Sequence, residues 1–337
     1  MRKEQENIDF LKIVFIVAII CYHCVRKIGF WNEGSYAVEL FFVISGYLLA
    51  KQSIADKDYT TNWDFAKEKI KKWFPLVLTI SLTNYLCGNH SLNTLLNNLT
   101  FSPNISDLAC NIAWYVNVLL WLSLFYFYII KHLGQKYVNL IISLLIFISW
   151  YVLQQINFVR GSLLGPKGSL GHFFHSAILT GFFCMGIGYF LSFLKEDKSK
   201  HKSYFYTILE ILFLGYPLLS MFNKSLYISA AGTVYAEIIL LVLFIKSKGY
   251  LSTLLNKVSW HYISKYVLSI YLLQDIVVKH LFGYILKHQK PLVLQHGYIS
   301  SFLLVLASFI IGIIGYYIIQ KPSEKLIDKL GNKTNLD

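Results

Sequence analysis

Long apolar stretches alternate with short polar segments along almost the whole chain. Most of these stretches approach or exceed the roughly 17 residues that an α-helix needs to cross a bilayer, and the second and fifth are short. The pattern predicts an all-α, polytopic integral membrane protein with about ten transmembrane helices. The expected spans are 9–25, 36–50, 73–87, 114–130, 138–153, 174–194, 204–222, 227–245, 266–285 and 299–319.

The composition leaves no room for a large soluble domain. Hydrophobic residues make up 55% of the chain and charged residues only 15%, and the longest loops hold only about 20 to 30 residues. We therefore expect one membrane-embedded domain over residues 1–330, followed by a short cytoplasmic tail at 331–337. The first apolar stretch has a basic lead-in but no small-residue cleavage site after it, so we interpret it as a retained span.

The net charge of +13 is distributed as in a multi-pass membrane protein. Of the 31 Lys and Arg residues, 22 fall in segments that lie on one side if the N-terminus is cytoplasmic. The positive-inside rule then predicts an even number of spans with both termini in the cytoplasm. This distribution argues against a nucleic-acid partner. We expect the protein to contact membrane lipids.

Ionisable residues interrupt the first two apolar stretches at particular places. Asp9, Lys12 and His23 lie on the first, and Glu39 lies near the start of the second. Lys12 and His23 are eleven residues apart, which on a helix leaves them about 20° apart around the axis and about 16 Å apart along it. The short connection at 26–35 predicts that His23 and Glu39 lie in the same outer leaflet. Such residues are expensive inside a bilayer and are functional candidates by default.

Two interpretations of His23 follow from the residues alone. It is either an inert, hydrogen-bonded histidine near the membrane surface or a general base that takes a proton from an attacking hydroxyl. Histidine suits the second task because its pKa lies near working pH. In that case Glu39 is the acid that orients the imidazole and stabilises its protonated form.

A lysine cluster precedes the third span. Lys69 and Lys72 are three residues apart and share a helix face just inside the predicted cytoplasmic end of that span. Positive-inside anchoring explains such a cluster in any membrane protein. The alternative is a clamp for the phosphates of a cytoplasmic acyl donor, and the residues leave both open.

Residues 7–52 resemble the opening segment of the membrane-bound acyltransferase family 3. That segment carries an acidic residue, a basic residue, a histidine, a second acid, two phenylalanines and Ser-Gly. The matching positions here are Asp9, Lys12, His23, Glu39, Phe41, Phe42, Ser45 and Gly46.

The resemblance extends further, with departures. Lys69, Lys72 and Pro75 match a family pattern of two arginines and a proline. Lysine stands for the usual arginine here and at Lys12, and Glu39 stands for an aspartate. The match thins toward the C-terminus, where Gln274 occupies a position often held by histidine and Gln320 replaces the glutamate of a closing Glu-x-Pro.

The resemblance implies an O-acyltransferase of the bacterial cytoplasmic membrane. Its donor would be acetyl-CoA, with no metal cofactor, and its acceptor a hydroxyl of a cell-surface polysaccharide or a lipid-linked glycan precursor. His23 would be the general base and Glu39 its orienting acid, while Lys12, Lys69 and Lys72 would contact the donor phosphates. Two other functions stay open: a polysaccharide flippase or polymerase, and a catalytically inactive membrane sensor of the same fold.

Further polar residues have several interpretations. Cys87 and Cys110 fall in one predicted outer loop, where a disulfide and two free thiols are about equally expected. Glu210, Glu237 and Asp275 either form a proton or sugar path or pair between helices.

The residues near the outer surface are similarly ambiguous. The loop 88–113 has no Lys or Arg and would suit a sugar or simply water. Asn117 is either an oxyanion donor or, in our preferred interpretation, a helix–helix hydrogen-bonding residue. His172 and His175 alone make a poor metal site.

Overall fold

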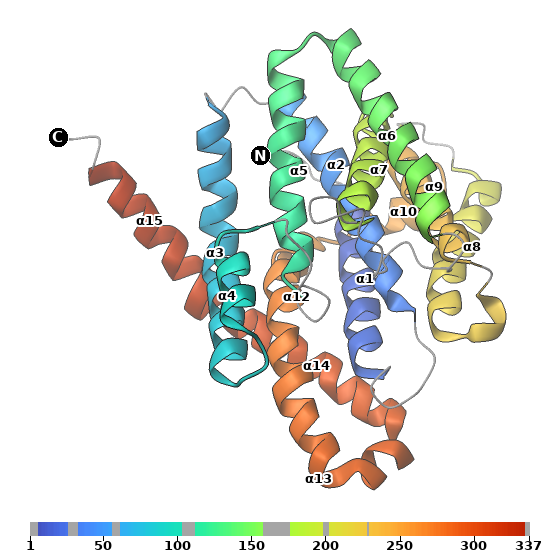
Figure 1. The fold of residues 1–337 in the computed structure, drawn as a ribbon. Helices are drawn as coiled ribbons and strands as arrows, with labels where there is room; N and C mark the ends of the chain where they lie inside the picture. The colour runs from blue at the N-terminus through green and yellow to red at the C-terminus, as the bar shows by residue number, and fades with distance from the viewer. Residues whose placement is uncertain are drawn as a thin grey trace. The chain divides into compact units, whose positions relative to one another are not determined.

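The computed structural model describes residues 6–25, 33–55, 61–102, 112–157, 176–197, 202–227 and 229–333 (Figure 1). These residues form helices and connecting turns, and no strand occurs among them. The all-α expectation is therefore confirmed. The long helices follow the hydropathy pattern, because each apolar stretch is long enough to complete several helical turns.

A helix occupies each predicted span for all or most of its length. These helices are α1 (Glu6–Val25), α2 (Ala37–Ala55), α3 (Asn62–Leu86), α5 (Trp114–His132), α6 (Gln135–Asn157), α7 (Ser176–Leu191), α8 (Tyr204–Phe222), α9 (Ala230–Lys246), α12 (Val267–Ile276) with α13 (Phe282–Gln295), and α14 (Gly297–Gly315). Shorter helices α4 (Leu92–Leu99), α10 (Tyr250–Leu255) and α11 (His261–Ser264) and the terminal α15 (Lys321–Lys333) lie between or after them.

Five of the described helical stretches are long and apolar enough to cross a membrane. They are Trp114–His132, Gln135–Gln154, Tyr204–Phe222, His261–Pro291 and Ile299–Lys329. The count of ten spans and the cytoplasmic placement of both termini stay predictions.

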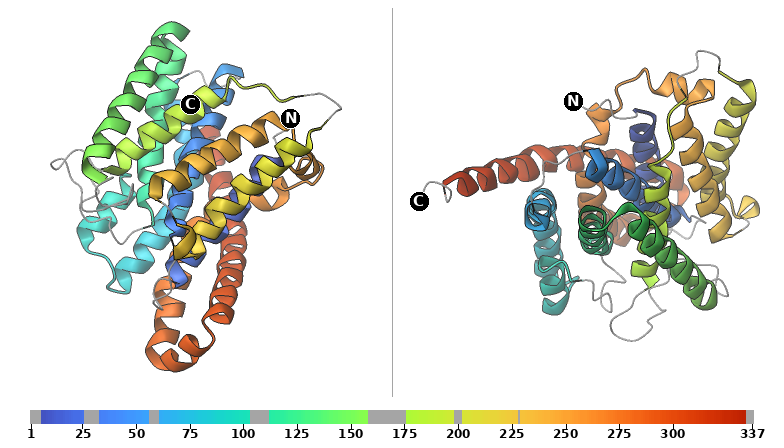
Figure 2. Two further views of the ribbon diagram at one scale, coloured as in Figure 1. Left: turned by 90° about the vertical axis from the view of Figure 1, so that its right-hand side faces the viewer. Right: turned by 90° about the horizontal axis from the view of Figure 1, so that it is seen from above.

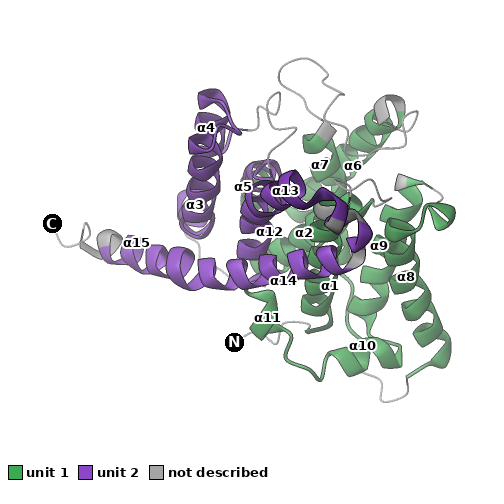
Figure 3. Cartoon of the chain, turned by 90° about the horizontal axis from the view of Figure 1, so that it is seen from below, with its two compact units in different colours: residues 1–57, 125–265 green, residues 58–124, 266–337 purple. Residues whose placement is uncertain are grey.

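The chain forms two compact units that interleave in sequence (Figure 3). Unit 1 consists of residues 1–57 and 125–265, and unit 2 of residues 58–124 and 266–337. In unit 2, α13 turns back into α14, and α14 packs along α12 (Figure 2). The single domain expected over residues 1–330 stays a prediction.

In unit 1, glycines bring α2 and α7 into direct backbone contact. A methyl group at Gly46 would overlap the backbone of Met185, and one at Gly188 would overlap the carbonyl of Val43. Small residues allow such close approach, which increases dispersion contacts between apolar helices. Gly46 belongs to the motif found in the sequence, and the fold gives it a packing role.

The start of α1 is fixed by a fully buried asparagine. The Asn7 side-chain amide donates to the carbonyl oxygen of Phe244, at 2.8 Å, and to Ser247 Oγ, at 3.1 Å. Its backbone N–H donates to Asn256 Oδ1 at 2.9 Å. Asn7 thereby ties α1 to the end of α9 and the end of α10, which fixes the position of the ionisable residues that follow it.

We expect Gly46→Ala to lower the stability of the purified protein by about 1 to 3 kcal/mol or more, because the added methyl group meets backbone that cannot rotate away. Thermal unfolding in detergent, followed by intrinsic fluorescence, measures the change. Gly215→Ala is the matched control, because the space around Gly215 on α8 is open within 4 Å. Equal melting temperatures for the two variants would contradict the packing role of Gly46.

Candidate active site

Lys12 and His23 lie on one unbroken helix, α1, as their spacing predicts. His23 lies in the last turn of α1 and is half-buried, and its ring makes an edge-on contact with Tyr22 at a centroid distance of 5.1 Å. The expected axial separation of about 16 Å between Lys12 and His23 therefore applies.

Lys12 is neutralised by a neighbour on its own helix. Its ammonium donates to Asp9 Oδ1 at 2.7 Å, and the Asp9 side chain is almost completely buried. The other carboxylate oxygen, Oδ2, lies 3.6 Å from His261 Nδ1, where α11 meets the start of α1. A charge-assisted pair of this kind stabilises two ions that apolar surroundings would otherwise exclude. Asp9 therefore positions Lys12, and about a fifth of the Lys12 side chain stays exposed.

Glu39 lies in the first turn of α2 and is completely buried. Neither of its carboxylate oxygens accepts a hydrogen bond from the described residues, so the expected contact from His23 to Glu39 is not formed in this structure. Glu237 on α9 is equally buried, also lacks hydrogen bonds, and interacts electrostatically with Glu39. Buried polar groups are nearly always paired, so two open carboxyl groups in one unit mark a functional candidate.

The lysine cluster divides into a paired lysine and two unpaired ones. Lys71 binds Glu68 at 2.8 Å and Asp328 of α15 at 2.7 Å. Lys69 and Lys72 form no salt bridge within the described part of the chain. The Lys69 ammonium instead lies over the rings of Phe65 and Trp73, at 5.2 and 5.8 Å from their centroids.

The electrostatics of Lys69 differ from those of an ordinary surface lysine. Burial and the neighbouring charge of Lys72 lower the pKa of Lys69 to about 8. A positive charge that is partly desolvated, unpaired and beside a second lysine has a strong affinity for an anion. Lys69 and Lys72 belong to unit 2, whereas Lys12, His23 and Glu39 belong to unit 1.

The comparison with protein families identifies the family of the whole chain. The model of the acyltransferase 3 family, described as an acyltransferase domain, matches residues 5–321. The chain belongs to this family. It is a membrane acyltransferase, and both the family resemblance and the apolar helices support its place in a membrane. No curated protein and no solved structure matches it.

Several other residues of this acyltransferase have structural partners. The Glu210 carboxylate accepts hydrogen bonds from the backbone N–H groups of Gly249, at 3.2 Å, and Ser252, at 3.1 Å. It thereby caps the start of α10, where an anion is favoured by the exposed N–H groups. Asn117 donates to the carbonyl oxygen of Ser102 at 3.4 Å. Gln274 donates to the carbonyl oxygen of Tyr271 at 3.0 Å, and its own amide oxygen is open.

Cys87 is an exposed free thiol, while Cys110 lies outside the described residues. His172 and His175 also lie outside them. Within the ranges that the structure describes, no three His, Cys, Asp or Glu side chains group closely enough to hold a metal ion.

Sequence reasoning missed two features of this acyltransferase. The first is the electrostatic interaction of Glu237 with Glu39, which requires knowing that α9 packs against α2. The second is a polar group around Asp275 in unit 2. Part of its signal was present in the sequence, because Lys279 follows Asp275 at i+4 spacing within an apolar stretch.

We expect Lys12→Met to destabilise this acyltransferase by about 3 to 5 kcal/mol, because it leaves the buried Asp9 carboxylate without its closest cation. Thermal unfolding in detergent measures the loss. The double variant Asp9→Asn with Lys12→Met removes both charges and should recover most of the stability. If Lys12→Met alone unfolds at the wild-type temperature, the ion pair with Asp9 does not stabilise the fold.

Proposed function

We propose that this acyltransferase moves an acetyl group from acetyl-CoA to a hydroxyl of a bacterial cell-surface polysaccharide or of its lipid-linked precursor. The family match over residues 5–321 carries the proposal. The arrangement of Lys12 and His23 on one face of α1 supports it, because the two ends of a thioester donor need a cation and a base. The site of action in this proposal is the bacterial cytoplasmic membrane.

In the proposed reaction His23 acts as the general base. One imidazole nitrogen accepts the proton of the acceptor hydroxyl while the hydroxyl oxygen bonds to the thioester carbonyl carbon. The tetrahedral intermediate then collapses, the carbon–sulfur bond breaks, and the leaving CoA thiolate takes the proton back from the imidazolium. The products are the acetyl ester and CoA with a free thiol, and His23 returns to its neutral form.

Glu39 is the proposed orienting acid. Its two oxygens have no other hydrogen-bond donor among the described residues, so both are available to an imidazole N–H. A carboxylate that accepts this bond selects the imidazole tautomer and stabilises the imidazolium formed during attack. The first turn of α2 adds favourable N–H dipoles at the same place.

Lys69 and Lys72 are the proposed contacts for the donor phosphates. Lys12 is a third proposed contact, where a phosphate would compete with the Asp9 carboxylate for the ammonium. Lys69 and Lys72 are the two lysines of their cluster that lack acidic partners, and Lys71 is already neutralised. In the predicted topology with ten spans and cytoplasmic termini, these lysines face the cytoplasm, where acetyl-CoA is found. An extended pantetheine arm would then cover the distance of about 16 Å along α1 to His23.

We expect O-acetyl groups to disappear from the surface polysaccharide when the gene is deleted or when His23 is changed to alanine. NMR of the purified polymer measures the loss, and polymer yield should stay unchanged. His132→Ala is the matched control, because His132 is an exposed histidine at the end of α5. Loss of the polymer itself on deletion would favour a flippase or polymerase, and full acetylation in the His23→Ala strain would contradict the base assignment.

We expect kcat/KM for acetyl-CoA to fall as pH rises through about 8, because Lys69 loses its proton there and its attraction for phosphate. Lys69→Arg keeps a charge whose pKa exceeds about 12, so the fall should move to higher pH. Steady-state kinetics from about pH 7 to about pH 9 measure the shift. The acceptor concentration is kept saturating throughout.

A second variant separates phosphate binding from general electrostatics. Lys72→Ala should raise the KM for acetyl-CoA about tenfold with little change in kcat. Lys67→Ala, on the same helix but over the ring of Trp63, should leave KM unchanged. If Lys67→Ala raises KM as much as Lys72→Ala, the lysines act only as a diffuse positive surface.

A further inference from the structure

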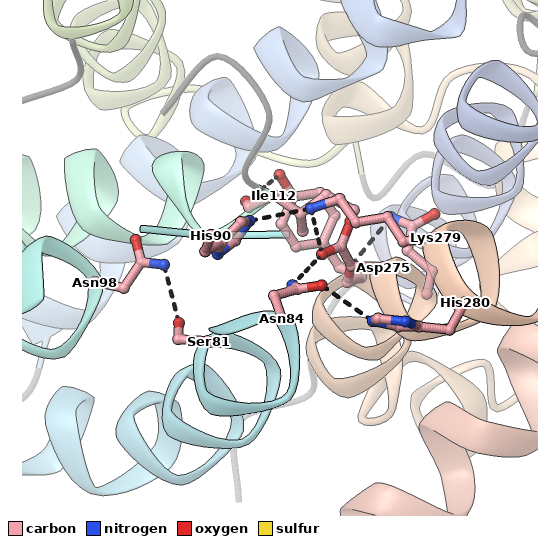
Figure 4. Close-up of polar contacts among 10 residues, drawn as sticks. Ser81, Asn84, His90, Asn98, Ile112, Asp275, Lys279 and His280 are labelled. Atoms are coloured by element: carbon pink, nitrogen blue, oxygen red, sulfur yellow. Dashed lines mark hydrogen bonds and ion pairs between the residues drawn. The ribbon is translucent and has the colours of Figure 1, made fainter. Parts of the chain in front are cut away.

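Unit 2 contains a polar group that the proposed reaction does not use (Figure 4). Asp275 Oδ2 accepts hydrogen bonds from Asn84 Nδ2, at 2.7 Å, and from the Lys279 ammonium, at 2.8 Å. Lys279 also lies 3.2 Å from His90 Nε2, and His280 Nε2 lies 3.2 Å from Asn84 Oδ1. These five residues are called the Asp275 cluster below.

A tight turn at the end of α3 brings His90 back to Asn84. Gly88 has a left-handed φ of +72°. The N–H of Asn89 donates to the carbonyl oxygen of Asn84 at 2.8 Å, and the N–H of Gly88 donates to that of Tyr85 at 3.0 Å. This is a Schellman turn, in which glycine is favoured because it adopts positive φ without steric cost.

A π-helical turn brings Lys279 and His280 to the same side. Residues Val277–Leu281 form this turn directly after α12. Adjacent side chains on an α-helix point about 100° apart, so only one of the two would usually face Asp275. The wider turn lets both reach the cluster, and π turns of this kind are rare and frequent at functional sites.

The hydrogen bonds inside the cluster leave one donor and one acceptor without partners among the described residues. Lys279 donates to His90 Nε2, so the proton of a neutral His90 resides on Nδ1, and that buried nitrogen has no partner among the described residues. Among the described residues the hydrogen bonds to Asp275 fall on Oδ2, which leaves Oδ1 as an acceptor there. A hydroxyl group both donates and accepts, so hydroxyl groups complement both kinds of atom.

The charge of the cluster favours a neutral ligand. Asp275 and Lys279 cancel each other in an ion pair. Burial, with a smaller contribution from Lys279, lowers the pKa of His90, which keeps its imidazole neutral. The Lys279 ammonium beside the imidazole also repels a metal ion. A phosphate would have to compete with the Asp275 carboxylate for the same lysine.

We infer that the Asp275 cluster binds a sugar ring of the acceptor through its hydroxyl groups. The inference rests on the proposed function and names the place where the acceptor is held. A carboxylate, an amide, an ammonium and two imidazoles together supply the mixed donors and acceptors that neighbouring hydroxyls require. The predicted topology places the end of α3 on the outer side, where a surface polysaccharide is found, and Asp275 within the predicted span 266–285.

The test measures direct binding of the acceptor and needs no acetyl transfer. The probe is a fragment of the strain's own surface polysaccharide, de-O-acetylated with mild base, added to the purified full-length protein in nanodiscs. Calorimetry gives the dissociation constant. Asp275→Asn and His280→Ala should each weaken binding about tenfold or more. His280 is half-buried, so its variant keeps the test usable if Asp275→Asn fails to fold.

Two control variants make the outcome specific. Ser81→Ala breaks the neighbouring bond from Asn98 to Ser81, at 2.9 Å, without touching the cluster, and should bind as the wild type does. His23→Ala should also bind normally, although it abolishes acetylation of the polymer in cells.

Equal affinity of His280→Ala and the wild type, or no binding by the wild type, would overturn the inference. In either case a loss of O-acetyl groups in the His23→Ala strain would leave the proposed function standing. Retained acetylation in that strain with normal cluster-dependent binding would instead contradict the proposed base and leave the sugar site in place.

Discussion

Ionisable side chains buried between apolar helices need compensating groups within the protein, because lipid and apolar side chains offer no hydrogen bonds. Most of the buried charges in this acyltransferase meet that need. Asp9 binds Lys12, Glu210 caps a helix start, and Asp275 binds Lys279 and Asn84. Glu39 and Glu237 do not, although both are completely buried. Two buried carboxyl groups without hydrogen bonds lower the stability of the fold. Their presence therefore favours a functional role for the region around Glu39 in unit 1.

Close helix packing accounts for part of the motif by which residues 7–52 resemble the family's opening segment. Gly46 lies where α2 meets α7 backbone to backbone, and Gly188 makes the reciprocal contact from α7. The same helix, α2, carries Glu39 seven residues earlier, about two helical turns away. A shift of α2 against α7 would therefore move the carboxylate directly. A residue without any reactive atom can in this way be as necessary to the site as the acid that it positions.

The sequence contained most of the information on where the helices lie and little on which polar residues meet. Hydropathy identified all five of the described stretches that are long and apolar enough to cross a membrane, because an apolar stretch of sufficient length leaves few alternatives to a helix. It could not show that Lys71 is neutralised while Lys72 is not, because the decisive partner, Asp328, is 257 residues further along the chain. The contacts of Asn7 depend in the same way on α9 and α10.

The Asp275 cluster could not be fully predicted from the sequence, for a different reason. Its assembly depends on two departures from regular α-helix, a left-handed glycine at Gly88 and a π turn at Val277–Leu281. Gly88 is a recognisable turn signal, but nothing in residues 277–281 distinguishes a π turn from an ordinary helical one.

Lysine stands at positions 12, 69 and 72, where the family resemblance leads us to expect arginine, and this difference has one physical consequence. A guanidinium binds phosphate through two parallel hydrogen bonds and keeps its charge at any biological pH. An ammonium is a point charge on a flexible stem, and its charge is lost when its surroundings lower the pKa, as they do at Lys69. Aromatic rings at Phe65 and Trp73 offset this by holding the ammonium in place through cation–π contacts. A donor site built from such lysines would bind by accumulated charge, so its affinity would depend more on pH and ionic strength than that of an arginine site.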